Sequence, residues 1–335
     1  MQFRSAVRLV CLALLFSSTL LIAQNSDLPN ETVSEVPPSQ PQHVYHDGSI
    51  RDIEAIGNRN IGCSRGFGNW YGLEHQIAMG KQYSARIEST SKLLHDPEVT
   101  EYVNRLGQEL VRNSDAQVAF TIKVIDSDDV NAFALPGGFF YVDSGLIVTA
   151  DNEAELAGVM AHEIAHVAAC HAMRGHTRNQ LMNIASIPLS MMTGPVGFAA
   201  YEAFTISRPF TFLKFSRGFE AEADFLGVQY MYRAGYDPQA LTAFFEKVKA
   251  MEKSKQNMVA RAFETHPQTS DRIEKTQNEI NTLLPPEAEY KVDSSEFEEI
   301  KAKLYHEQMH HQTGSRPTLH RMPSLVDGSP ASPAQ

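Results

Sequence analysis

The sequence from Ala157 to Ala169 is almost unbroken in small and apolar residues, and this feature most constrains the fold. A stretch without a polar face is expected to form a helix that is buried on all sides. His162, Glu163 and His166 interrupt it, and burying such side chains costs free energy unless they have partners or a function. His162 and His166 are four residues apart, so a helix places both imidazoles on one face, where they can bind one Zn²⁺ ion. Glu163 lies beside them, where its carboxylate can accept a proton from a water molecule.

The same His-Glu-x-x-His pattern occurs a second time, from His306 to His310. Charged residues surround this copy, among them Glu298, Lys301 and Lys303, and they indicate a solvated helix close to a polar tail. We therefore interpret the second copy as part of a surface helix and the first copy as the candidate metal site.

A catalytic zinc ion needs a third protein ligand, and an acidic stretch downstream contains the best candidate. Glu220 and Asp224 are four residues apart and share one helix face, whereas Glu222 points away from that face. We predict that Glu220 is the third metal ligand and that Asp224 hydrogen bonds to a ligand histidine. The alternative is that these acidic residues only complement the dipole at the start of a helix.

The periodicity around these motifs predicts mainly helices. The predicted helices span residues 73–94, 97–110, 152–173, 219–234 and 239–253, and one strand is predicted at 120–125. Residues 131–142 form two strand-like pieces around Pro136, Gly137 and Gly138. Proline and glycine at such a place favour an edge strand or hairpin whose backbone stays open to a partner.

Residues 179–201 carry no charge but contain two prolines and two glycines. That composition favours two short helices or a loop over a membrane-spanning helix. Because the segment lies between the two ligand-bearing motifs, we expect it to form a lid over the site or to contact a membrane surface. The alternative is that it fills the core.

Acidic residues outnumber basic residues by 40 to 29, and the net charge of −11 argues against a nucleic-acid partner, which requires a basic surface. Arg4 and Arg8 precede an apolar run from Val10 to Ala23. This pattern predicts a signal peptide and an exported protein. Its removal would leave two cysteines, Cys63 and Cys170. Either a disulfide between them or two free thiols is consistent with the sequence.

The composition divides the chain into four predicted parts. They are a signal peptide at 1–23, a flexible linker rich in Pro, Ser, Gln and Asn at 24–47, the main domain at 48–285, and a polar tail with one amphipathic helix at 286–335.

Five motifs occur in order along the main domain. They are Asn131–Gly138, Asn152–Ala157, His162–His166, Glu220–Asp224, and Thr265–Pro267 followed by Arg272 and Ile273. Together they resemble the CAAX prenyl endopeptidase, HtpX and BepA-like family of zinc metalloendopeptidases, in its soluble exported branch. The resemblance covers roughly residues 70–280. It implies an α+β, mostly helical, zincin-like (gluzincin) domain with a small sheet whose edge strand borders the active site.

The resemblance also implies roles for individual residues around one Zn²⁺ ion per chain. The metal ligands would be His162, His166 and Glu220, and the catalytic residues would be Glu163, Asp224, His266 and Arg272. In relatives the histidine at the position of His266 can approach the metal or the developing oxyanion, and the arginine lies near the site. A histidine before a proline in a loop can also be purely structural.

Two features of the family are missing from this sequence. The membrane-spanning helices of the CAAX and HtpX branches are absent, so processing of prenylated proteins is not expected. The tetratricopeptide repeats of BepA-like members are also absent, so no partner-binding array can be inferred.

We therefore expect a zinc metalloendopeptidase that hydrolyses misfolded or unassembled envelope proteins, for protein quality control in the periplasm of a Gram-negative bacterium. The alternative is a non-catalytic, chaperone-like protein that binds unfolded envelope proteins and contains a structural zinc ion. Glu163 argues against this alternative, because a structural zinc does not need a base beside it. A further alternative is metal buffering by the tail histidines, which are His306, His310, His311 and His320.

Overall fold

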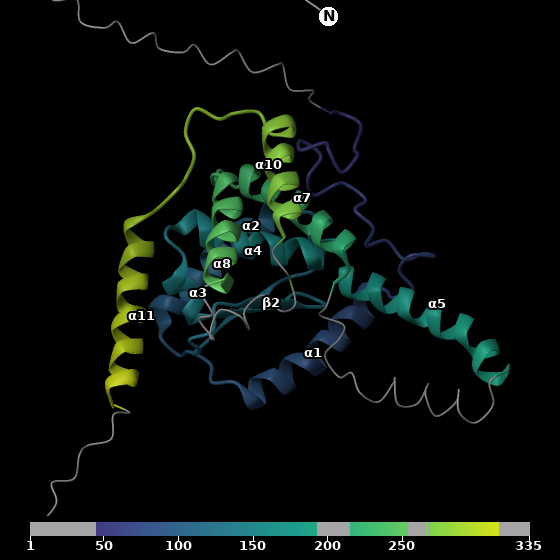
Figure 1. Cartoon of the computed structure of the whole chain (residues 1–335), viewed down its shortest axis with the longest axis horizontal. Helices are drawn as coiled ribbons and strands as arrows, with labels where there is room; N and C mark the ends of the chain where they lie inside the picture. The colour runs from purple at the N-terminus through teal and green to yellow at the C-terminus, as the bar shows by residue number, and fades with distance from the viewer. Residues whose placement is uncertain (1–44, 193–214, 254–265, 267–268, 315–335) are drawn as a thin grey trace, which may run out of the picture. The chain divides into compact units, whose positions relative to one another are not determined.

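The computed structural model describes residues 45–192, 215–253, 266 and 269–314 of the 335 residues (Figure 1). The predicted signal peptide and nearly all of the predicted linker lie outside these residues. The helices are α1 (Leu73–Thr90), α2 (Pro97–Arg112), α3 (Ser144–Thr149), α4 (Glu153–Ala168), α5 (His171–Met192), α7 (Arg217–Arg233), α8 (Gln239–Lys253), α10 (Ser270–Leu283) and α11 (Ser295–Gly314), and the strands are β1 (Thr121–Ile125), β2 (Ala132–Leu135) and β3 (Phe139–Asp143). This composition confirms the expected α+β, mostly helical fold.

The three strands form one small mixed sheet in the order β1-β3-β2. β1 runs parallel to β3, and β2 pairs antiparallel with β3, so that Ala134 lies opposite Phe140. The turn between β2 and β3 contains Gly137 and Gly138, whose φ angles of 78° and 88° are rarely adopted by residues with a side chain. Within the described part of the chain β2 is therefore an edge strand that enters a glycine turn, as the sequence predicted.

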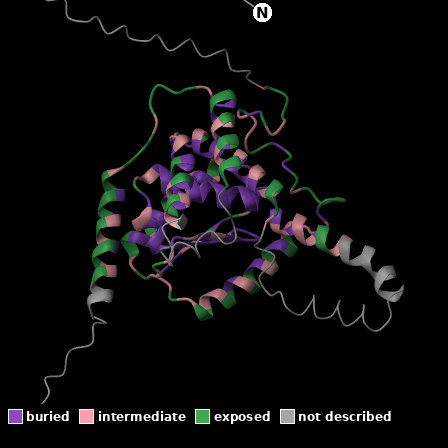
Figure 2. Ribbon diagram, in the orientation of Figure 1, coloured by how far each residue is buried: buried purple, intermediate pink, exposed green. Residues whose placement is uncertain are grey.

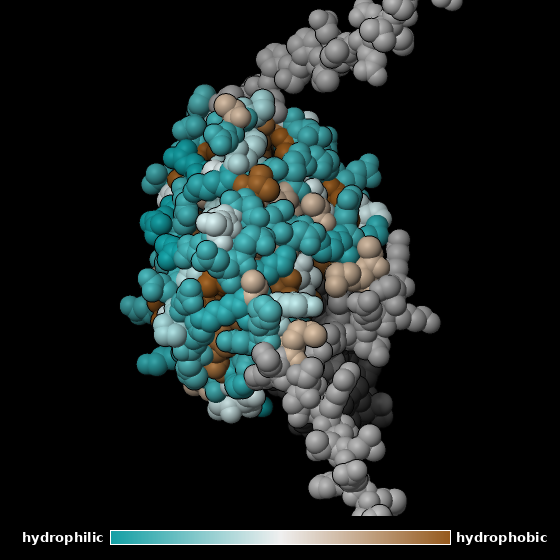
Figure 3. Space-filling view, turned by 90° about the vertical axis from the view of Figure 1, so that its left-hand side faces the viewer, coloured by the Kyte–Doolittle hydropathy of each residue, from teal (hydrophilic) through white to brown (hydrophobic). Residues whose placement is uncertain are grey.

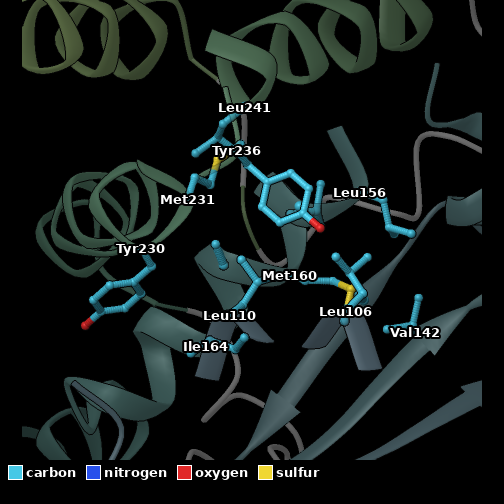
Figure 4. Close-up of a cluster of buried hydrophobic side chains, with 14 of the residues drawn as sticks. Leu106, Leu110, Val142, Leu156, Met160, Ile164, Tyr230, Met231, Tyr236 and Leu241 are labelled. Atoms are coloured by element: carbon cyan, nitrogen blue, oxygen red, sulfur yellow. The ribbon is translucent and has the colours of Figure 1, made fainter. Parts of the chain in front are cut away.

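Helix α4 is buried along its length and lies at the centre of the core (Figure 2). It packs against α2, α7, α8 and β2. Burying one large aliphatic side chain stabilises a fold by about 1.5–3 kcal/mol, so a core of this size holds α4 firmly. The side chains around it include Leu106 and Leu110 of α2, Val142 of β3, Leu156, Met160 and Ile164 of α4 itself, and Tyr230 and Met231 of α7 (Figure 4).

Helix α7 approaches α4 closely at Gly227. A Cβ atom built at this position would lie 3.3 Å from the backbone of His162, so a side chain there would require the two helices to shift by a few tenths of an ångström. Glu220 lies two helical turns before Gly227, on the same side of α7. The close approach therefore carries Glu220 toward the histidines of α4.

Helix α4 does not continue to residue 173 as the sequence predicted. It ends at Ala168, and α5 begins at His171 after a turn. Cys170 in that turn has a φ of 54°, which is incompatible with a right-handed helix. A disulfide joins Cys170 to Cys63. Of the two alternatives that the sequence left open, a disulfide or two free thiols, the structure shows the disulfide.

Helix α5 includes the first part of the uncharged segment. Residues 179–192 belong to this one helix, although two short helices or a loop were expected. Pro188 lies inside it, and an interior proline removes a backbone hydrogen bond and can kink a helix without ending it. Residues 193–201 lie outside the described residues. Among the helices that the structure describes, none is long and apolar enough to cross a membrane.

Helix α11 lies where the sequence predicted an amphipathic helix. Its buried side chains Phe297, Ile300 and Leu304 belong to the same core as α4. The face of the molecule that carries α11 is mainly hydrophilic (Figure 3). His306, the first residue of the second His-Glu-x-x-His pattern, is exposed on this helix, as expected for a solvated surface.

We expect loss of the Cys63–Cys170 disulfide to destabilise the fold. The bond joins residues that are 107 positions apart. Constraining an unfolded chain over a loop of that size is worth about 4–5 kcal/mol in the chain-entropy treatment. Urea denaturation of the double variant Cys63→Ser/Cys170→Ser is expected to show a clearly lower free energy of unfolding than oxidised wild-type protein. Reduced wild-type protein is the control and should resemble the variant, whereas equal stability of all three samples would contradict the prediction.

Candidate metal centre

Helices α4 and α7 bring the three predicted metal ligands together. The Nε2 atoms of His162 and His166 lie 3.1 Å apart. The carboxylate oxygens of Glu220 lie 3.7 Å from His162 Nε2 and 3.6 Å from His166 Nε2. All three side chains are buried. The side chains of two motifs that are distant in the sequence thus meet at one point in the interior.

The chemistry and spacing of this donor set fit a zinc ion. Zn²⁺ binds nitrogen and oxygen ligands at about 2.0–2.2 Å in a tetrahedron, which separates neighbouring ligand atoms by about 3.3–3.6 Å. The separations of 3.1, 3.6 and 3.7 Å are close to that range. The local charge also fits a cation. With Glu163, Glu220 and Asp224 ionised, Arg272 protonated and the histidines neutral, as metal binding requires, the buried charge is −3 + 1 = −2, which a divalent cation would balance.

Glu163 lies between the ligand histidines and the sheet. The backbone of Ala134 on β2 favours the charged form of Glu163, and Glu163 Oε1 lies 3.6 Å from His266 Nε2. Burial raises the pKa of Glu163, although the nearby histidines oppose that shift. A carboxylate whose pKa is raised holds a proton more readily near neutral pH, which suits a group that accepts a proton and then returns it.

Asp224 and Arg272 form a buried pair behind His162. Asp224 Oδ1 lies 3.0 Å from His162 Nδ1. Arg272 donates two hydrogen bonds to the same carboxylate, from Nε to Oδ2 at 2.7 Å and from Nη2 to Oδ1 at 2.6 Å, and its Nη1 lies 2.9 Å from Glu220 Oε2. Burial disfavours the charged form of Asp224, but the hydrogen bonds with Arg272 and His162 outweigh burial and lower its pKa. The pair therefore stays ionised and holds His162 with its Nε2 toward the other ligands.

His266 joins the cluster from a separate part of the chain. Its Nδ1 lies 2.9 Å from Glu220 Oε1. One ligand atom from each of His162, His166, Glu220 and His266 lies within 4.8 Å of the others. Burial disfavours protonation of His266, but Glu163 and Glu220 outweigh burial and raise its pKa. With His266 and Arg272 in place, all the site residues predicted from the sequence lie in one buried cluster.

Two further residues contact this cluster, and the sequence interpretation missed the role of Glu222. His171 Nδ1 lies 2.9 Å from His166 Nδ1, and Glu222 Oε2 lies 3.2 Å from His171 Nε2. Glu222 does point away from the ligand face of α7, as predicted, but it points toward His171. The sequence did contain a signal for this role, because Glu220, Glu222 and Asp224 are acidic residues at alternate positions of one helix.

A cavity of about 510 Å³ reaches this region between α7 and α10. Glu220, Asp224 and Arg272 line it from the side of the metal cluster. Its other lining residues include Phe215, Arg217, Thr269, Lys275 and Glu279. The cavity therefore adjoins the buried carboxylates of Glu220 and Asp224, whereas Glu163 and the ligand histidines do not line it.

The second His-Glu-x-x-His pattern forms no comparable cluster in the part of the chain that the structure describes. There, only the group around His162 brings three or more His, Cys, Asp or Glu side chains close enough to share a metal ion. His320 of the tail, and the side chains of His310 and His311, fall outside that description, so metal buffering by the tail stays a prediction.

Comparison with known proteins identifies the family of this chain. The sequence profile of peptidase family M48 matches residues 97–280, which is more than half of the chain. The beta-barrel assembly-enhancing protease of Yersinia pestis is 32% identical over 224 residues, covering 64% of this chain and 45% of that protein. The mitochondrial metalloendopeptidase OMA1 of Schizosaccharomyces pombe is 30% identical over 206 residues, covering 59% of this chain and 56% of that protein. Metalloprotease LoiP of Escherichia coli K12 is 30% identical over 199 residues, covering 58% of this chain and 77% of that protein.

The chain spans about half the length of the beta-barrel assembly-enhancing proteases that it matches. The matched family region nevertheless includes α4, α7 and Arg272, so it contains the elements that build the buried cluster. The chain therefore belongs to peptidase family M48.

Proposed function

We propose that this protein is a zinc-dependent endopeptidase that cleaves misfolded or unassembled envelope proteins in the periplasm of a Gram-negative bacterium. The observation that carries the proposal is the buried group of His162, His166 and Glu220, with Glu163 between it and an edge strand. One relative is named as a beta-barrel assembly-enhancing protease, and that name supports an envelope substrate. The predicted signal peptide and the Cys63–Cys170 disulfide support an oxidising compartment outside the cytoplasm.

Each residue of the cluster has a proposed task in peptide hydrolysis. His162, His166 and Glu220 would hold one zinc ion per chain, and zinc supplies a Lewis acid for the scissile carbonyl and lowers the pKa of a water molecule. Glu163 accepts a proton from the attacking water and returns it to the leaving amine. His266 donates a hydrogen bond to the oxygen on which negative charge develops.

The edge strand β2 offers a binding place for an extended polypeptide. The unpaired backbone groups of an edge strand can add a further strand. Helix α4 packs against β2, and the Ala134 backbone is close enough to Glu163 to favour its charged form, so a peptide on this edge would pass close to the base. Strand addition recognises backbone groups, which every unfolded chain exposes, and this accounts for action on misfolded proteins without a specific side-chain pocket.

The uncharged segment at 179–201 is a proposed contact for a membrane surface or a proposed lid over the cleft. Faster cleavage of small peptides by a folded deletion variant would support a lid. Loss of binding to vesicles in the same variant would support the membrane contact.

Glu163→Gln is expected to retain zinc and to lose cleavage of unfolded casein by about 10²–10⁴-fold, because glutamine cannot accept the proton. The matched control is Glu307→Gln, which makes the same change in the second His-Glu-x-x-His pattern and is expected to cleave as wild type does. Cleavage rates and zinc content would be measured on all three proteins. Cleavage at the wild-type rate by Glu163→Gln would exclude Glu163 as the base, and zinc-loaded wild-type protein that cleaves nothing would favour the chaperone-like alternative.

His266→Phe separates the two roles that the family resemblance left open. If His266 stabilises the oxyanion, kcat is expected to fall by about 10²–10³-fold while zinc affinity stays unchanged. A large loss of zinc affinity, measured by equilibrium dialysis, would instead identify His266 as a metal ligand.

Arg272→Met is expected to destabilise the metal-free protein by about 3–5 kcal/mol, because it leaves the buried carboxylates of Asp224 and Glu220 without their cation. Lys275→Met, an exposed change on the same helix, is the control and is expected to have little effect. Urea denaturation would measure both. Equal losses of unfolding free energy in the two variants would show that the buried Arg272–Asp224 pair contributes no more than an exposed ion pair.

A further inference from the structure

His166 begins a chain of polar contacts that leads away from the metal cluster, in which His171 Nε2 contacts Glu222 at ion-pair distance rather than through a well-aligned hydrogen bond. Its Nδ1 lies 2.9 Å from Nδ1 of His171, and His171 Nε2 lies 3.2 Å from Glu222 Oε2. Arg174 Nη1 donates a hydrogen bond of 3.0 Å to Glu222 Oε1. His171 is fully buried, whereas the side chains of Glu222 and Arg174 are 21% and 23% exposed. The chain therefore runs from a metal ligand to the surface.

The hydrogen positions along this chain follow from the chemistry of its members. When His166 binds a metal through Nε2, its Nδ1 carries the hydrogen and donates it. His171 Nδ1 then accepts, so the hydrogen of the neutral His171 ring is on Nε2. That nitrogen faces the Glu222 carboxylate, which only accepts hydrogen bonds. Every link thus has one donor and one acceptor.

We infer that His171 is a positioning residue for the metal ligand His166, with Glu222 and Arg174 as its support. His171 holds the imidazole of His166 with Nε2 toward the cluster and makes that nitrogen a stronger ligand. The inference rests on the proposed zinc site and deepens it, because it identifies a residue that controls metal affinity without touching the metal.

The break between α4 and α5 makes this contact possible. In an unbroken helix, residues five positions apart point about 140° away from each other, so His171 would face away from His166. The turn at Cys170, with its φ of 54° and its disulfide to Cys63, redirects the chain. The ring of His171 then stacks on Phe219 of α7, with 4.6 Å between the ring centroids, which limits its rotation.

The other ligand histidine is held in a related way. His162 Nδ1 faces Asp224, which accepts two hydrogen bonds from Arg272. In both cases the last two members are a carboxylate from α7 and an arginine. The chain behind His166 differs by one additional imidazole, that of His171, which lies between His166 and Glu222 of α7.

The variant His171→Phe tests the inference, because it removes the hydrogen bond to His166 and the polar contact with Glu222 and keeps a ring that can stack on Phe219. We expect the Kd for Zn²⁺, measured by competition with a chromophoric chelator at fixed pH, to rise by about 10–100-fold. We also expect the visible absorption band of the Co²⁺-loaded variant to change, because the His166 ring is no longer fixed. A purely structural His171 would lower the stability of the metal-free protein and leave the Kd and the Co²⁺ spectrum unchanged.

His176→Phe is the matched control. His176 also lies on α5 and forms a side-chain hydrogen bond, of 2.8 Å to the Tyr71 hydroxyl, but it is not part of the chain behind His166. This variant is expected to keep the wild-type Kd. His171→Asn, whose side-chain oxygen can accept a hydrogen bond from His166, is expected to bind zinc more tightly than His171→Phe does.

A wild-type Kd and an unchanged Co²⁺ spectrum in His171→Phe would overturn the inference. If that variant does not fold, Glu222→Gln takes its place, because it keeps the shape of the side chain and weakens the acceptor for His171. A smaller but measurable rise in the Kd is then expected, and an unchanged Kd would overturn the inference. Failure of the proposed function is distinguishable, since wild-type protein itself would then fail to bind zinc or to cleave.

Discussion

The interior of this molecule holds the carboxyl groups of Glu163, Glu220 and Asp224 together with the guanidinium of Arg272, and charges of this kind are stable in an apolar core only when they are paired. When the histidines are neutral, as metal binding requires, the pairing is incomplete, because three carboxyl groups face one arginine. A divalent cation at the convergence of His162, His166 and Glu220 would complete it. The metal is thus expected to stabilise the same core that positions it.

The apolar core explains how such a site can be held in place. Helix α4 is buried on all sides, so its two ligand histidines cannot shift without disturbing packing against α2, α7, α8 and β2. Gly227 allows α7 to approach α4 closely enough for Glu220 to reach the histidines. The carboxylates of Glu222 and Asp224, also on α7, then fix the far sides of the two imidazoles. One helix therefore supplies a metal ligand and the supports of both other ligands.

Much of the site could be predicted from the sequence because helical spacing is local. The four-residue separations of His162 from His166 and of Glu220 from Asp224 determine which side chains share a face. The glycines after Pro136 likewise signal the turn between β2 and β3. In contrast, the hydrophobic pattern runs on through residues 169–173, so nothing local indicated that the helix breaks at Cys170. The left-handed backbone conformation of Cys170 and its disulfide to Cys63 depend on a contact between distant parts of the chain. The contact of Glu222 with His171 follows from the break that they cause.

The central claim is that His162, His166 and Glu220 bind one zinc ion. Anomalous X-ray diffraction at the zinc absorption edge, from crystals of protein purified without chelator, tests it most directly. The account predicts one strong anomalous peak per chain, within bonding distance of the Nε2 atoms of both histidines and of the Glu220 carboxylate. No peak at that position, or a peak only at His306 and His310, would contradict it.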